Sequence, residues 1–172
     1  MWLRSVWVCS GQSNMQMPIG NPTCWNASNV NCTSKGAQCS YGCVENAGDE
    51  ITAMAKFNHN IRLFTVGGSS KKAESATMSS ATGWLTPEQM GGKFSATCWF
   101  FGRDLSTKVT DRPLGFIETN VGGTPDQHWS SQDAINQCKG SDPWSWPANF
   151  SDSVLWNGMV VPLLRTTIKG SI

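Results

Sequence analysis

A serine directly after the first apolar segment of the chain has the surroundings of a nucleophile. Residues 6–10 form a short apolar run that predicts a strand, and the turn that follows contains Gly11 and Ser13. Because glycine allows a sharp bend, the Ser13 hydroxyl would be held at a rigid strand end and point out of the sheet. We therefore take Ser13 as a candidate esterase nucleophile; the alternative is a helix cap or a turn residue. The turn lacks the second glycine of a G-x-S-x-G motif, so it does not support an α/β-hydrolase fold.

A second predicted strand ends in a pair of glycines. Residues 113–119 form the strand, and Asn-Val-Gly-Gly-Thr-Pro follows at 120–125. Without a Cβ, the main chain at Gly122 and Gly123 can approach a tetrahedral centre closely. Together with the N–H of Ser13, their N–H groups form a candidate oxyanion hole.

Four short motifs, in this order, resemble the sialate O-acetylesterases, a branch of the SGNH hydrolases. They are Gly-Gln-Ser-Asn-Met at 11–15, Gly-Gly-Thr-Pro at 122–125, Trp129, and Leu-Trp-Asn-Gly-Met at 155–159 followed by Pro162-Leu163. The likeness covers most of residues 2–20 and 61–172. It implies that Ser13 removes O-acetyl groups, most of all from sialic acids, through an acyl-enzyme, with no cofactor and no metal. The substrate-binding residues would be Gln12, Asn14, Thr124 and Trp129.

Two other functions stay open at this point. One is an acetylesterase that acts on acetylated plant or microbial polysaccharide. The other is a non-catalytic glycan-binding remnant that stacks sugar rings on Trp129, Trp144 and Trp146, although such tryptophans also serve simply to anchor a loop.

The resemblance also shows what the sequence lacks. SGNH esterases activate the serine with a His oriented by an Asp, and these relatives place a Trp-Tyr-Gln-Gly-Glu-like segment after the strand that here ends at Ile172; neither motif is in the sequence. Of the two histidines, His59 is expected at the surface. His128 imitates an Asp-x-His spacing, but it lies where relatives carry no catalytic base. We therefore expect an N-terminal part of an esterase domain, truncated at its C-terminus, inactive alone and poorly soluble.

The order of predicted elements indicates an α/β protein with a parallel sheet. Further strands are expected at 61–66 and 167–172, and helices at 93–109 and at 153–164, the last capped by Ser153. Residues 69–92 are expected to be an exposed loop anchored by Trp84 alone. We predict one flavodoxin-like three-layer sandwich of the SGNH type over 1–172. In such a sheet the first and third strands are neighbours, so the serine and the glycines would meet beyond their carboxyl ends.

Cysteine usage indicates an oxidising compartment. Of the seven cysteines, four lie in an insertion at about 21–50 that has almost no aliphatic residues, and disulfides would stabilise such a loop. These are Cys24, Cys32, Cys39 and Cys43; Cys138 is expected to be free or bridged to this loop. The rival interpretation, a zinc site, lacks C-x-x-C spacing and a nearby His. Cys9 and Cys98, in a strand and a helix, are predicted to be buried free thiols.

Sequons and charge define the expected environment. Glycosylation sequons at Asn26, Asn31 and Asn149 agree with a secreted or lysosomal glycoprotein. A net charge of +1 without a basic run argues against a nucleic-acid partner, and no apolar run approaches the roughly 20 residues of a membrane span. The expected partner is an acetylated glycan, with a complementary C-terminal segment as a second partner.

Overall fold

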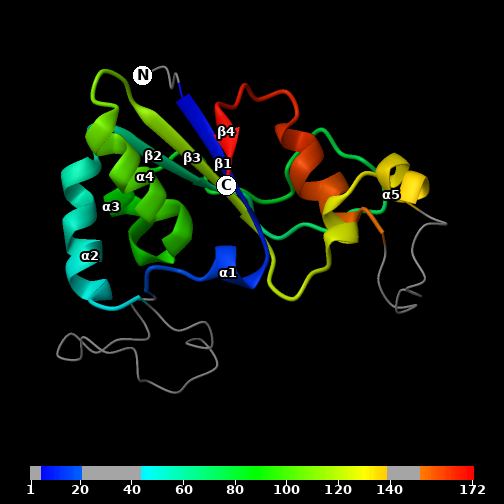
Figure 1. Cartoon of the computed structure of the whole chain (residues 1–172), viewed down its shortest axis with the longest axis horizontal. Coiled ribbons are helices and arrows are strands. Elements are labelled where there is room, and N and C mark those ends of the chain that lie inside the picture. The colour runs from blue at the N-terminus through cyan, green and yellow to red at the C-terminus, as the bar shows by residue number, and fades with distance from the viewer. Residues whose placement is uncertain (1–4, 21–43, 139–151) are drawn as a thin grey trace.

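A four-stranded parallel sheet forms the centre of the computed structural model, which describes residues 5–20, 44–138 and 152–172 (Figure 1). Its order is β2-β3-β1-β4. The strands are β1 (Ser5–Gly11), β2 (Ile61–Thr65), β3 (Leu114–Asn120) and β4 (Gly170–Ser171). The predicted parallel α/β class is confirmed, as is the predicted contact between the first and third strands. Without the edge strand β2, the remaining order β3-β1-β4 is that of the first three strands of a flavodoxin-like sheet.

Helices α2 (Ala47–Met54) and α4 (Ala96–Lys108) cover one face of the sheet, which we call the α4 face (Figure 1). The predicted helix at 93–109 is thus present. Ser95 caps α4, because its Oγ accepts a hydrogen bond from the N–H of Cys98 at 3.2 Å. The helix lies very close to the sheet at Gly102, where an added Cβ would be 2.8 Å from the ring of Phe116.

Irregular helical turns cover the opposite face, which we call the π-helix face. They are η5 (Trp156–Val160), a π-helix, and η6 (Val161–Leu163), a 3₁₀ turn. Leu155, Met159 and Leu163 pack there on Val8 and Ile117 of the sheet. The predicted cap by Ser153 is wrong. Its φ is +62°, and its buried hydroxyl has no hydrogen-bond partner among the described residues; its backbone carbonyl accepts from Asn157 instead.

The stretch predicted as an exposed loop is only partly one. It contains α3 (Pro87–Met90) and a 3₁₀ turn, η3 (Gly91–Lys93). Thr86 and Gln89 form a capping box at the start of α3, and Met90 is buried in the core. Trp84 is 40% exposed and contacts Phe64, so it is not the main anchor.

A disulfide joins Cys9 of β1 to Cys98 of α4, so the prediction of two free thiols is wrong. The packing of α4 on the sheet brings the two Cα atoms to 5.8 Å, a normal disulfide separation. Cys138 is exposed at the end of α5 (Gln132–Cys138), a helix that Ser131 caps by accepting from the N–H of Ala134 at 3.2 Å. The four cysteines of the insertion, the three sequon asparagines, Trp144 and Trp146 lie outside the described residues.

Candidate active site

Ser13 is the first residue of the one-turn helix α1 (Ser13–Gln16), two positions after β1 ends. Gly11 has a φ of +152°, a conformation that a residue with a side chain rarely adopts, and this lets the chain leave the sheet abruptly. The carbonyl of Gln12 accepts from the N–H groups of Met15 and Gln16, at 3.0 and 2.9 Å. Ser13 itself is half-buried.

The N-terminus of α4 supports this turn. The N–H of Ala96 donates to the carbonyl of Met17 at 2.8 Å, and the hydroxyl of Thr97 donates to the carbonyl of Asn14 at 3.4 Å. Both ends of a helix leave backbone groups unpaired, N–H groups at the start and carbonyls at the end. Here the start of α4 satisfies carbonyls of the serine turn.

The diglycine loop after β3 lies against the same turn. Asn120 is in register with Gly11, and the N–H of Val121 donates to the Gly11 carbonyl at 3.1 Å. The N–H of Gly122 donates to Oε1 of Gln16 at 2.7 Å. The two segments that the sequence singled out are therefore in direct contact.

The two candidate glycine donors differ in whether their N–H groups already have a hydrogen-bond acceptor. The N–H of Gly122 is bound to Gln16, so an oxyanion reaches it only if the Gln16 side chain moves. Gly123 is exposed with a φ of +73°, and among the described residues its N–H donates to no backbone or side-chain acceptor.

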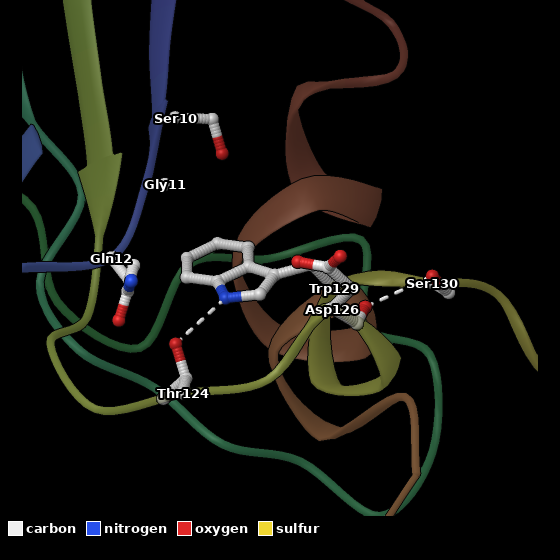
Figure 2. A pocket seen from close by; sticks show the side chains of 7 residues that line it. All are labelled: Ser10, Gly11, Gln12, Thr124, Asp126, Trp129 and Ser130. Atoms are coloured by element: carbon white, nitrogen blue, oxygen red, sulfur yellow. Dashed lines mark hydrogen bonds between the residues drawn. The ribbon is translucent and has the colours of Figure 1, made fainter. Parts of the chain in front are cut away.

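A cavity of about 300 Å³ opens between the end of β1 and the loop after β3 (Figure 2). It is lined by Ser10, Gly11, Gln12, Thr124, Asp126, Trp129 and Ser130. Figure 2 shows the indole of Trp129 extending from the 3₁₀ turn η4 (Asp126–Trp129) toward the end of β1. Its Nε1 donates to Oγ1 of Thr124 at 2.9 Å, and that hydroxyl donates to the carbonyl of Val121 at 2.6 Å.

The predicted substrate-binding residues divide into two groups. Gln12, Thr124 and Trp129 line the cavity, whereas Asn14 is exposed on α1 and does not. Ser13 directly follows a lining residue without itself belonging to the cavity wall.

The two histidines lie in different parts of the fold. His59 is exposed just before β2, at the end of the parallel sheet opposite to Ser13. His128 is buried in η4 and does not line the cavity.

Two polar residues near the serine turn were not predicted. Gln16 joins the turn to the diglycine loop. Glu118 of β3 is only 5% exposed, and burial raises the pKa of its carboxyl above the ordinary value despite hydrogen bonds from Thr65, Ser95 and Asn120. A carboxylate directly after the apolar residues 114–117 of β3 was the visible signal, since an unpaired charge is rarely buried.

Within the described ranges, no three His, Cys, Asp or Glu side chains group as metal ligands would. Nor is any helix there long and apolar enough to cross a membrane.

The chain resembles known esterases along almost its whole length. It is 32% identical to the sialate O-acetylesterases of Homo sapiens and Pongo abelii and 29% identical to that of Rattus norvegicus, in each case over 97% of the chain. It spans 30% of the length of the first two relatives and 34% of the third. No family model matches. A carbohydrate acetylesterase from Xanthomonas citri has a similar fold, with a TM-score of 0.68 and 23% identity over 97% of this chain and 31% of that one.

Proposed function

The chain is homologous to the sialate O-acetylesterases, and on this premise we propose that it provides the nucleophile and part of the oxyanion hole of a carbohydrate acetylesterase. One observation carries the proposal. The Ser13 turn and the Gly122-Gly123 loop meet through the hydrogen bonds Val121 to Gly11 and Gly122 to Gln16.

The proposed reaction proceeds in two steps. The Ser13 oxygen attacks the acetyl carbonyl carbon and loses its proton to a base, the bond to the sugar oxygen breaks, and the sugar leaves with a proton. The N–H groups of Ser13 and of Gly123 donate to the developing oxyanion, and Gly122 joins them if Gln16 moves. Water then hydrolyses the acetyl-serine and releases acetate. The family resemblance assigns the base to a His–Asp pair, and we do not assign that role to His59 or His128.

The cavity next to the turn is the proposed sugar subsite. Trp129 offers an aromatic face for a sugar ring, and its hydrogen bond to Thr124 fixes the ring plane. Gln12 and Ser130 add polar groups suited to sugar hydroxyls. Following the homology, an O-acetylated sialic acid is the first candidate substrate, and a secreted or lysosomal location would suit it.

A neutral acetylated polysaccharide is the second candidate, and the charge of the cavity favours it. A sialic acid carries a carboxylate, for which Arg or Lys is the usual partner. Among the described residues, the seven that line the cavity include the acidic Asp126 and no basic residue. Hydrolysis of acetylated xylan with no hydrolysis of O-acetylated sialic acid would decide for this second substrate.

Acetate-burst kinetics test the assignment of Ser13. The assay combines the chain with the proposed complementary segment that supplies the His–Asp pair, because no residue of the chain itself is assigned as the base. With a chromogenic acetate ester, we expect Ser13→Ala to lose at least about 10³-fold in turnover. Ser10→Ala is the matched control, because Ser10 lines the same cavity but has no proposed role in the chemistry. If Ser13→Ala keeps the turnover of the parent protein, Ser13 is not the nucleophile. If glycans then also bind both proteins equally, the chain is a glycan-binding remnant.

A further inference from the structure

A buried carboxylate that the proposed reaction does not use lies close to the serine turn. Glu118 is on β3, two residues before that strand ends, and it is 5% exposed. Charged side chains are rarely buried to this extent unless their partners require it. Its partners therefore indicate what it does.

Those partners belong to the elements around the site. One carboxylate oxygen accepts from Oγ1 of Thr65 on β2 at 2.6 Å, and the other accepts from the backbone N–H of Ser95 at 2.6 Å. Ser95 is fully buried and is the residue that caps α4. The Asn120 side chain also donates to Glu118, and its Nδ2 reaches the carbonyl of Met15 in the serine turn at 3.5 Å.

The contact with Ser95 has consequences beyond α4 itself. The N–H of the next residue, Ala96, donates to Met17, and the hydroxyl of Ser95 donates to the sulfur of Met15 at 3.4 Å. Residues 15 and 17 belong to the turn that carries Ser13. A displacement of the α4 N-terminus would therefore move the backbone on which the Ser13 hydroxyl depends.

Stability alone does not account for a charge at this position. Burial raises the pKa of the Glu118 carboxyl, so the ionised form is less favourable in the folded protein than in the unfolded chain. Groups that oppose folding in this way are typical of functional sites.

We propose that Glu118 is a positioning residue for Ser13: by accepting the Ser95 N–H it fixes the N-terminus of α4, and α4 in turn fixes the serine turn. This inference rests on the proposed role of Ser13. It assigns no chemical step to Glu118.

Three variants separate the positioning role from a general loss of packing. Glu118→Met has a similar volume but no oxygen to accept the Ser95 N–H. Glu118→Gln keeps one acceptor oxygen. Thr65→Val is the matched control, because it removes the other strong hydrogen bond of Glu118 and leaves α4 untouched.

Hydrogen exchange and kinetics are both measured on each variant. In Glu118→Met we expect amides of residues 15–17 to exchange about tenfold faster, as the loss of one buried hydrogen bond implies. In the assay that also contains the complementary segment, we expect kcat for an acetate ester to fall up to about 10²-fold, with KM unchanged, because a small displacement of a nucleophile has effects of that size. Glu118→Gln should recover most of both, and Thr65→Val should change neither.

Hydrogen exchange and kinetics together distinguish the positioning role of Glu118 from the proposed function of Ser13. Unchanged exchange in a folded Glu118→Met variant overturns the positioning role, whatever the kinetics show. Faster exchange in a protein whose turnover does not depend on Ser13 overturns the proposed function and leaves the structural link between Glu118 and the turn.

A measurement on the unmodified protein covers the case in which Glu118→Met does not fold. In native-state exchange with increasing denaturant, the amides of Ser95 and of residues 15–17 should open in one cooperative event. If the turn opens while Ser95 stays protected, Glu118 does not hold the turn.

Discussion

The two faces of the sheet support the two halves of the candidate site by different means. On the α4 face, a regular 13-residue helix, the Cys9–Cys98 disulfide and the Glu118 contacts converge on the turn that carries Ser13. On the π-helix face, a π-helix and a 3₁₀ turn pack on the sheet, and Trp129 of η4, the turn after the diglycine loop, packs against the same cluster. From this comparison we expect the candidate nucleophile to be held more rigidly than the proposed sugar subsite. Rigid support suits a reacting group, whereas a subsite tolerates adjustment.

The disulfide should account for the largest difference between the faces. It closes a loop with a sequence separation of 89, so replacing both Cys9 and Cys98 by Ala should lower the free energy of unfolding by about 4 kcal/mol. Urea denaturation measures this change. Cys138→Ala is the control. An equal loss of unfolding free energy in the control would mean that the Cys9–Cys98 disulfide itself does not stabilise the fold.

Two buried methionines compare the packing of the faces directly. Met54 packs in the α4-face core and Met159 in the π-helix-face core, and both are 0% exposed. Each change to Ala should lower the free energy of unfolding by roughly 2–5 kcal/mol. We expect the smaller loss for Met159→Ala, because irregular turns can collapse into the cavity that the substitution leaves. Denaturation of the two variants checks this order. A larger loss of stability for Met159→Ala would show that the core on the π-helix face relaxes less around a cavity than the core on the α4 face does.

Glu118 should make the α4 face sensitive to pH. Because burial raises its pKa above the ordinary 4.5, the folded protein binds this proton more tightly than the unfolded chain does. The contribution of Glu118 to stability is therefore greatest at low pH and decreases as pH rises from about 4.5 through the folded-state value. Denaturation at several pH values should show the parent protein losing stability relative to Glu118→Gln as pH rises. A constant difference would mean that the folded and unfolded pKa values are equal.

The smallest expected effect is in the sugar subsite. Trp129→Phe removes the 2.9 Å hydrogen bond to Thr124 and should lower the free energy of unfolding by about 1 kcal/mol. Thr124→Val removes the same bond from the other side, so a double-mutant cycle isolates the interaction. In the assay with the complementary segment, we expect both single variants to raise KM for an acetylated glycan more than they lower kcat, and the reverse pattern would place Trp129 nearer to the reacting atoms.

Local signals in the sequence predicted the main elements and both site segments. The apolar runs of β1 and β3, the helical spacing in α4 and the glycines after β3 are properties of consecutive residues. The capping box of Thr86 and Gln89 was an equally local signal for α3, and it was overlooked.

The remaining features depend on contacts between distant residues. The Cys9–Cys98 bond, the Gln16–Gly122 contact and the partners of Glu118 join segments separated by 23 to 106 positions, and no spacing pattern encodes them. The positive φ of Ser153 likewise follows from how its segment packs. Sequence alone therefore located the candidate nucleophile but not its support.

The hydrogen bond between Gln16 and Gly122 bears on ligand affinity. A ligand oxygen that takes the Gly122 N–H has to displace an internal acceptor, so it exchanges one hydrogen bond for another and gains little net free energy. In the proposed reaction, this replacement of one acceptor by another would have a second effect after turnover, because the glutamine oxygen would take the place of a departing acetate. The arrangement would weaken product inhibition while leaving the amide correctly aimed for the next acyl group.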